Sequence, residues 1–571
     1  MIENRHISNL PNSKNNDYNL GEMGIPCLLT SADEGHKLAT RDQNIYPSWA
    51  RFMLLMRQTV AKDRRVFLID GKPIVCCINW LRDHIHEMKA YKHWEYDLKN
   101  YLTFMAGHQH ESGFFYEITA CSDNFHITSI CKPSLVKMLE GDGVALVRIE
   151  LENDIEYLFV EGVKNVYQAT GDDEWAKEML PHMEKGINYL FECPKRYDKE
   201  TGLLKRVFTI DTWDFDHIYK GLDRNIYEDS PMSIMHGDNT GTYNAMMSLA
   251  WFNRRFGNEK KAQEWEKRAA VLLENINRVC WNGNFYTHQV HLNHNGIDDL
   301  EEERLSLSNA YALNRGVFTQ EQAATVIEEY LSRKDHAFAE WFSIDPPYDK
   351  FGNFERNSYI NGGIASFVAG ELAKGAFEHG YEAYGWDILN RLRDLIIRDR
   401  ELFFLYDPIT QKNQAGGPSG WSAAAIMDAI DRGLAGIVDE DVCYRKIKFA
   451  PRWAITGINE IRYITGYEAS GNIVETIFRQ DEDSMVLDLR TPSKEVVAHI
   501  LLPVGKTADK IMVNEKKIKF EKSQIRDSVY VDFKLEGLKG ERLIIYINLA
   551  ESNVIDDPGN KKESNIYGEI Y

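Results

Sequence analysis

Apolar residues recur every three or four positions between about residue 45 and residue 435, and this period predicts an almost entirely helical segment. One apolar stripe covers 155–166, and after the turn at 170–173 a second stripe covers 175–190. We interpret the two stripes as a helical hairpin. The same pattern returns at 243–251 with 265–280, and again around Gly380.

The turns between paired stripes resemble one another and read TGDDEW, FGNEKKAQEW and HGYEAYGW. In each, a glycine ends one helix and an acidic residue begins the next, as helix C-caps and helix dipoles favour. Their spacing is irregular, whereas a solenoid repeats at a fixed period of about 20 to 50 residues. The pattern therefore predicts a mainly α fold in which helical hairpins close into a ring, with long loops on one face holding the site.

The residue pattern changes near residue 440, where short runs rich in β-branched and aromatic residues alternate with polar turns. These runs are 485–489, 496–502, 511–513, 529–533 and 543–547. They predict a β-sandwich of about 110 residues. The last stretch has too little apolar content to fold alone. We thus expect four parts: an N-terminal extension (1–44), a helical barrel (45–438), a C-terminal β-sandwich (439–552) and a tail (553–571).

Composition and charge narrow the function. Among 571 residues, 67 are Lys or Arg and 87 are Asp or Glu, a net charge of −20. Nucleic acid is therefore excluded as a partner, because phosphate binding needs clustered cations. No apolar run reaches the roughly 18 residues of a membrane span, and the first residues lack a signal-peptide pattern. We expect a soluble, cytoplasmic protein with no membrane partner.

Neither a metal nor another cofactor is indicated. None of the eight cysteines stands in a metal-ligand spacing. His288, His291 and His294 are spaced like metal ligands, but no cysteine or paired carboxylate accompanies them. We assign the three histidines a core or loop role. The chain is rich in aromatic residues, with 12 Trp, 28 Tyr and 26 Phe, which suits sugar stacking as well as core filling.

Five segments that mix polar and aromatic residues interrupt the helical pattern, at 80–84, 209–217, 235–239, 359–363 and 414–421. Cleavage of an acetal needs one carboxylic acid to protonate the leaving oxygen and a second carboxylate on the opposite face. Asp214, between Trp213 and Phe215, is our candidate for the acid, because an apolar neighbour keeps a carboxyl protonated. Asp211 and Asp216 fit a helix-capping role about as well.

These segments resemble a known family. TWDF (212–215) resembles the element that carries the general acid in the six-hairpin (α/α)6-barrel glycosidases, the group of trehalase, processing α-glucosidase I and bacterial rhamnosidase-like enzymes. WLRD (80–83), YINGG (359–363) and the GWSAA segment after Tyr406 are similar to further elements, in the same chain order. The resemblance covers about 45–435 and implies an (α/α)6 toroid barrel, which a β-sandwich domain follows.

The chain departs from this family at the second carboxylate. In the processing-glucosidase relatives the base lies two positions before the YDP tyrosine, and that position is Phe404 here. Glu355, Glu401 and Asp407 are the nearby substitutes. Glu355 is favoured because it lies in a loop beside YINGG, although a surface ion pair explains it equally well.

The candidate sugar-binding residues are Trp80, Arg82, Asp83, Trp213, His236, Asp238, Asn361 and Trp421. Arg82 and Asp83 could clamp hydroxyls or simply pair with each other. Asp238 could bind sugar or act only as the N-cap of a helix over 240–255. Glu152, Asp154 and Glu156 begin an inner helix, and because the helix dipole alone favours acids there, we assign them no chemistry.

The leading hypothesis is an inverting, exo-acting glycoside hydrolase that acts on short oligosaccharides or small glycosides, with inversion implied by the resemblance. An inverting phosphorylase is the second hypothesis, because the base is missing and the Gly416–Gly417 loop at a helix N-terminus suits phosphate. A carbohydrate-binding protein without activity is the third. The sugar, its linkage and the oligomeric state stay open, since the β-domain could pack on its own barrel or form a homo-oligomer.

Overall fold

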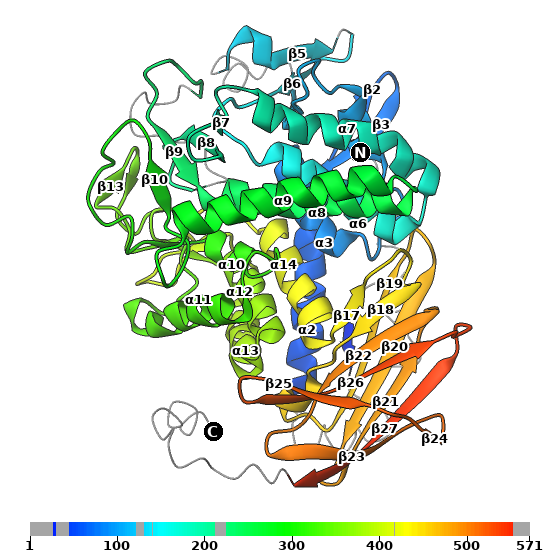
Figure 1. The fold of residues 1–571 in the computed structure, drawn as a ribbon. Helices are drawn as coiled ribbons and strands as arrows, with labels where there is room; N and C mark the ends of the chain where they lie inside the picture. Colours follow the sequence, from blue (N-terminus) through cyan, green and yellow to red (C-terminus); the bar gives the residue numbers. More distant parts are fainter. Residues whose placement is uncertain are drawn as a thin grey trace.

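A helical barrel and a sheet domain make up the protein (Figure 1). The structure is a computed structural model that describes residues 27–29, 45–121, 131–139, 141–211, 224–415 and 417–551. The sheet domain, orange to red in Figure 1, lies beside one end of the barrel.

Six helices of the described chain contact one another in a closed order and form the inner ring. They are α3 (Leu81–Tyr91), α6 (Ile155–Thr170), α8 (His236–Arg255), α10 (Ser308–Ala312), α12 (Ser366–Glu378) and α14 (Gly420–Asp428). Each contacts the next, and α14 contacts α3. Their side chains are buried on nearly every face, as expected of helices that have neighbours all round.

Six further helices alternate with the inner ones along the chain and cover the ring from outside. They are α2 (Ile45–Lys62), α4 (Asn100–Gly107), α7 (Asp173–Glu192), α9 (Glu259–Cys280), α11 (Gln320–Ser332) and α13 (Glu382–Asp399). α9 buries one stripe, from Ala262 through Trp265 and Ala269 to Ile276, and exposes the rest. The predicted hairpins α6–α7, α8–α9 and α12–α13 are confirmed.

The alternation of inner and outer helices makes all inner helices run the same way, so their N-terminal residues meet at one end of the barrel. Contacts between helices agree: the start of α3 contacts the start of α6 through Arg82 and Asp154. At the other end, Lys92 after α3 bonds Asn165 late in α6, and Lys374 late in α12 bonds Asp428 at the end of α14. Acidic side chains therefore gather at the N-terminal end, and lysines at the C-terminal end.

The connections of the barrel carry small sheets, so the prediction of an almost entirely helical segment is wrong there. These strands are β2 (Arg64–Ile69), β3 (Lys72–Cys77), β4 (Ile118–Cys121), β5 (Val136–Leu139), β6 (Val144–Val147), β7 (Tyr197–Asp198), β8 (Leu203–Val207), β9 (Met232–Met235), β10 (Gln289–His291), β11 (Leu305–Ser306), β12 (Ile344–Asp345), β13 (Lys350–Phe351), β14 (Phe354–Glu355), β15 (Ile364–Ala365) and β16 (Leu405–Tyr406). At two to six residues each, they are too short to show a period of two.

The sheet domain has two sheets. The seven-stranded sheet has the order β1-β19-β20-β21-β27-β23-β24, and the five-stranded sheet has the order β17-β18-β22-β26-β25. The strands are β1 (Cys27–Leu29), β17 (Ile437–Asp439), β18 (Lys446–Phe449), β19 (Glu460–Tyr467), β20 (Asn472–Gln480), β21 (Ser484–Arg490), β22 (Glu495–Leu501), β23 (Lys506–Val513), β24 (Lys516–Lys517), β25 (Glu521–Ile525), β26 (Ser528–Glu536) and β27 (Arg542–Glu551). Because β1 pairs with β19, the predicted N-terminal extension contributes a strand to this domain.

Gly370 sets how closely α12 and α14 approach. A Cβ atom at Gly370 would lie 2.7 Å from the carbonyl carbon of Ala425 and 2.8 Å from the amide nitrogen of Ile426. Both atoms belong to the backbone of α14, so no side-chain rotation relieves the clash. The ring therefore needs glycine here.

We predict that Gly370→Ala lowers the free energy of unfolding by about 1 to 3 kcal/mol, because overpacking forces the two inner helices apart. Gly107→Ala is the matched control: its Cβ would meet no atom within 4 Å, at the last residue of α4. This control should change stability by less than about 1 kcal/mol, and in the stabilising direction. Urea unfolding of both variants checks the difference, and equal stabilities would contradict it.

Candidate active site

Arg82 joins the starts of two inner helices. Its Nε and Nη2 atoms donate to the two carboxylate oxygens of Asp154, at 2.5 and 2.9 Å, and Nη2 lies 2.5 Å from Glu152 Oε2. All three side chains are buried. The guanidinium is therefore occupied by protein carboxylates, and not by Asp83 as one sequence interpretation allowed.

A second buried arginine lies beside this pair. Arg148 Nη2 donates to Glu156 Oε2 at 3.1 Å and to the Glu152 carbonyl at 2.7 Å, and Nη1 lies 3.9 Å from Glu117 Oε2. Burial, with the adjacent Glu152 carboxylate, raises the pKa of Glu117 well above its ordinary value. The acids at the start of α6 thus belong to a buried ion cluster, a role beyond the helix-dipole effect that the sequence suggested.

Asp83 points differently from its neighbour Arg82. It lies one turn before His86 and Glu87 on the same face of α3, and these two side chains reach α14: His86 stacks on Trp421, and Glu87 lies under Gly420. The Asp83 side chain is partly exposed and accepts no hydrogen bond from another described residue. Burial raises the pKa of Asp83 to about 7; Asp63 and Glu152 add to this, and Arg82 opposes it.

Asp238 and His236 begin the inner helix α8. This helix starts at His236, so Asp238 lies in the first turn, and the interpretation of Asp238 as N-cap is wrong. Neither carboxylate oxygen of Asp238 has a hydrogen-bond partner among the described residues, and its nearest cation is Arg206, at 3.6 Å. His236 Nε2 lies 3.3 Å from Ser306 Oγ, while its Nδ1 has no partner in the described chain.

Asp214 and Trp213 lie outside the described residues. The segment that leads to them is fixed at the N-terminal end of the ring: Ser308 Oγ, in the first turn of α10, donates to Asp211 Oδ1 at 2.7 Å. Two buried side chains hold the preceding carbonyls, with Gln289 donating to Thr209 and His288 to Ile210. His288 Nδ1 also lies 2.8 Å from Glu301, so this histidine has a support role in the described structure.

Aromatic side chains lie between the inner helices α3, α10, α12 and α14. Trp421 stacks on His86 with centroids 4.1 Å apart, and its Nε1 donates to the Tyr311 hydroxyl at 2.8 Å. The resembled family has its base at the position of Phe404. The ring centroid of Phe404 lies 4.8 Å from that of Phe367 and 5.7 Å from that of Trp421. The position of the missing carboxylate is thus part of an aromatic wall. His86 Nδ1, inside this wall, has no partner among the described residues.

The three carboxylates suggested as substitutes for the base have other partners. Glu355, with its side chain 68% exposed, lies on the β13–β14 hairpin and bonds Lys350 at 2.6 Å. Glu401 lies 3.4 Å from Lys62. Asp407 accepts from the amides of Ile409 and Thr410 and from Gln414 Nε2, and so fixes its own turn.

Two further candidates differ in how they are held. Asn361 Nδ2 donates to the carbonyls of Tyr348, Phe354 and Glu355, and its Oδ1 accepts from the Tyr348 amide. Its amide hydrogens are therefore used to hold the hairpin. Trp80, at the N-cap of α3, is partly exposed and pairs with Ile118.

The start of α14 already holds an anion from the protein itself. The Gly420 amide donates to Asp63 Oδ2 at 2.7 Å, and the Ser422 amide donates to Ser419 Oγ at 3.1 Å. Glu87 lies beside Asp63, and burial raises the pKa of both carboxyls. Gly416 lies outside the described residues. Two amides at this helix N-terminus, those of Gly420 and Ser422, are thus occupied, which weighs against the phosphate site that the sequence suggested.

Comparison with known proteins agrees with this architecture. Residues 237–341 match the trehalase family model, and this range holds α8, Asp238 and the buried His288. This part of the chain is thus similar to trehalase. No curated protein sequence matches the chain.

Solved structures with the same fold include three rhamnosidases. The GH78-family rhamnosidase of Bacillus sp. GL1 has a TM-score of 0.56 at 13% identity, over 84% of this chain and 43% of its own. The α-L-rhamnosidase of Dictyoglumus thermophilum has a TM-score of 0.53 at 12% identity, over 82% of this chain and 46% of its own. The α-L-rhamnosidase of Streptomyces avermitilis, complexed with L-rhamnose, has a TM-score of 0.51 at 11% identity, over 82% of this chain and 38% of its own. The chain thus spans less than half the length of these proteins, and the likeness to them is one of fold.

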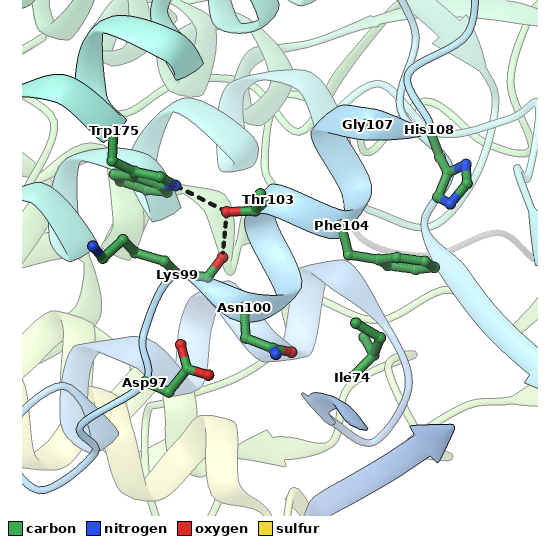
Figure 2. Close-up of a pocket in the computed structure, with 9 residues that line it drawn as sticks. All are labelled: Ile74, Asp97, Lys99, Asn100, Thr103, Phe104, Gly107, His108 and Trp175. Atoms are coloured by element: carbon green, nitrogen blue, oxygen red, sulfur yellow. Dashed lines mark hydrogen bonds between the residues drawn. The ribbon is translucent and has the colours of Figure 1, made fainter. Parts of the chain in front are cut away.

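A groove of about 580 Å³ lies away from the inner ring, on the outer helix α4 (Figure 2). Its polar groups are largely taken by protein partners: Lys99 Nζ bonds Asp172 at 2.5 Å, and Trp175 Nε1 donates to Thr103 Oγ1 at 2.9 Å. Asp97 on its rim is exposed. We therefore place the candidate site at the ring end and not here.

Two searches of the described residues gave no match. No helix among them is both long and apolar enough to cross a membrane. No group of three or more His, Cys, Asp or Glu side chains within the described ranges is arranged to hold a metal ion.

We predict that the Asp238 carboxyl makes stability depend on pH. Burial raises its pKa to about 7; Asp154 and Asp211 add to this, and Arg206 opposes it. Between about pH 4 and pH 7 the folded protein holds a proton that the unfolded chain has lost, so stability falls as pH rises, by up to about 1.4 kcal/mol per unit. Asp238→Asn lacks this proton and should gain stability relative to wild type from pH 5 to pH 7 in urea unfolding.

Asp349→Asn is the control, because it removes an exposed carboxylate that pairs with Arg356. Its stability should run parallel to that of wild type between pH 5 and pH 7. A constant difference between Asp238→Asn and wild type over this range would show that Asp238 is ionised in the folded protein.

Proposed function

We propose that the protein is an inverting, exo-acting glycoside hydrolase whose substrates are short oligosaccharides or small glycosides, bound where the inner helices begin. The observation that carries this proposal is the group of buried polar atoms without hydrogen-bond partners at that end. They include both carboxylate oxygens of Asp238, Nδ1 of His236 and Nδ1 of His86. Buried polar atoms are normally paired, and sugar hydroxyls can both donate to and accept from such groups.

The binding roles divide among the candidates by how their side chains are held. Asp83, Asp238 and His236 keep polar atoms for a ligand, and Trp80 is partly exposed beside them. Trp421 contributes to the aromatic wall, which suits the apolar face of a sugar ring. Arg82 acts through the protein, because its guanidinium fixes Asp154 and Glu152. Asn361 holds the hairpin beside the site.

We keep Asp214 as the general acid and Trp213 as its neighbour in the site. The observation that supports these two assignments is the position of Asp211, earlier in the same segment, which accepts a hydrogen bond from Ser308 at the start of α10. In this mechanism the Asp214 carboxyl protonates the glycosidic oxygen as its bond to the anomeric carbon breaks, and water attacks that carbon from the opposite face. Inversion of the anomeric configuration follows.

We predict that Asp214→Asn lowers kcat about 100- to 10,000-fold on glycosides with poor leaving groups, because proton donation to the leaving oxygen is lost. On p-nitrophenyl glycosides the loss should be much smaller, since this leaving group departs as an anion. The assay is proton NMR of the anomeric signals on a panel of α- and β-linked disaccharides and aryl glycosides, with aryl rhamnosides included because of the rhamnosidase neighbours.

Each reaction is run with and without inorganic phosphate. Free sugar of inverted configuration, independent of phosphate, supports the proposal. Sugar phosphate that forms only when phosphate is present would establish a phosphorylase instead, and tight binding without turnover would establish a binding protein. An Asp214→Asn variant with wild-type rates on every leaving group would end the assignment of the acid.

A further inference from the structure

An inverting hydrolase needs a carboxylate that activates water on the face opposite the acid. In the resembled family this group precedes the last inner helix, but here Phe404 occupies the position and packs against Phe367 and Trp421. Three properties distinguish the described carboxylates near the ring end: whether a cation or amide already holds the side chain, whether water can reach it, and on which side of the ring it lies.

Most of these carboxylates are held by protein partners. Arg82 holds Asp154 and Glu152. Arg148 holds Glu156, and Glu117 accepts from the Ile149 amide at 3.0 Å. All four side chains are also buried, whereas a group that activates water must be reached by water.

Nearer to α14, Asp63 accepts from the Gly420 amide. The Glu87 carboxylate has no hydrogen-bond partner among the described residues, but it is fully buried beneath that glycine, so water does not reach it. Asp211 accepts from Ser308. Glu355, Glu401 and Asp407 carry the ion pairs and turn contacts described above.

Asp83 and Asp238 remain, and their places in the ring differ. Asp238 is fully buried on α8. α14 lies opposite α8 in the closed order, three helices away in either direction, and α3 is the neighbour of α14. Asp83 on α3 is thus near the side of the ring where the family has its base. Asp83 is also partly exposed, whereas Asp238 is buried, and a group that activates water must be accessible to water.

From this placement we propose that Asp83 is the general base that replaces the family carboxylate missing at Phe404. The inference rests on the proposed hydrolase function. The Asp83 carboxylate takes a proton from water while the water oxygen bonds to the anomeric carbon. The glycosidic carbon–oxygen bond breaks, its electron pair leaves with the oxygen, and that oxygen takes the proton of Asp214. The products are an alcohol and a free sugar of inverted configuration, and exchange with solvent restores both carboxyls.

The surroundings of Asp83 suit a base that works near neutral pH. The charged and titratable groups around it are Arg82 and Glu87 on its own helix, Asp63 after α2, Tyr101 on α4 and Glu152 before α6. Burial, Asp63 and Glu152 raise its pKa to about 7 against the effect of Arg82. A base must be ionised, so kcat/KM should fall as pH drops below about 7.

The test is chemical rescue of Asp83→Ala on the aryl glycoside that wild type cleaves fastest. Without the base, kcat should fall about 100- to 10,000-fold, with KM changed by no more than about threefold. Sodium azide needs no deprotonation to attack, so it should raise the kcat of the variant at least about tenfold. The product should be a glycosyl azide of inverted configuration, which proton NMR detects. Asp97→Ala, which removes an exposed aspartate on the outer wall, is the matched control and should keep wild-type rates (Figure 2).

The outcomes separate the base from other roles. A rise in KM without azide rescue would show that Asp83 holds a sugar hydroxyl, and near-wild-type turnover would show that another group activates water; either result overturns the proposal. If Asp83→Ala does not fold, the near-isosteric Asp83→Asn carries the same assay, with its fold checked by near-ultraviolet circular dichroism. Absence of turnover in wild type would refute the hydrolase function itself, which is a different result from failure of Asp83 alone.

Discussion

The buried contact of Arg82 with Asp154 and Glu152 ties the start of α3 to the start of α6, and much of the site end is organised around it. An ion pair so deep in the protein gains little net free energy, yet removal of one partner leaves an uncompensated buried charge and typically costs about 3 to 5 kcal/mol. The bidentate geometry also fixes the direction of the helix on which Asp83 lies, so that Arg82 faces α6 while Asp83 lies on the face toward α14.

The helical hairpins and the sheet domain could be predicted because each leaves a long periodic signal. α7 and α9 expose one side to solvent, so their apolar residues fall on a stripe, and strands such as β27 alternate buried and exposed residues. The short strands between helices carry no such signal. β1 could not be predicted either: three residues cannot show a period, and their partner β19 is far away in sequence.

The candidate site was only partly predictable, for a different reason. MHGDN was correctly placed where an inner helix begins, whereas WLRDH was expected to interrupt the helical pattern and instead begins α3. The spacing of residues also does not show where a side chain points. Arg82 was expected to touch sugar and instead holds acids, and the amide hydrogens of Asn361 hold a hairpin. Glu152 and Asp154 gave no signal of their ion cluster, because helix dipoles also favour acids at N-termini. Arg82, early in the preceding inner helix, was the sequence feature that could have indicated this ion cluster.

The common direction of the inner helices also polarises the barrel along its axis. Six helix N-termini place partial positive charge at the site end, which would by itself oppose the positive charge that develops on a sugar ring as its glycosidic bond breaks. The acids of that end offset these dipoles only where they are ionised, and burial raises the pKa of Asp83, Glu117 and Asp238, so their negative charge develops as pH rises. The lysines near the opposite end complement the helix C-termini. The electrostatic field along the barrel axis therefore depends on pH, and under the proposed function it favours a cationic sugar more strongly as the acids of the site end lose their protons.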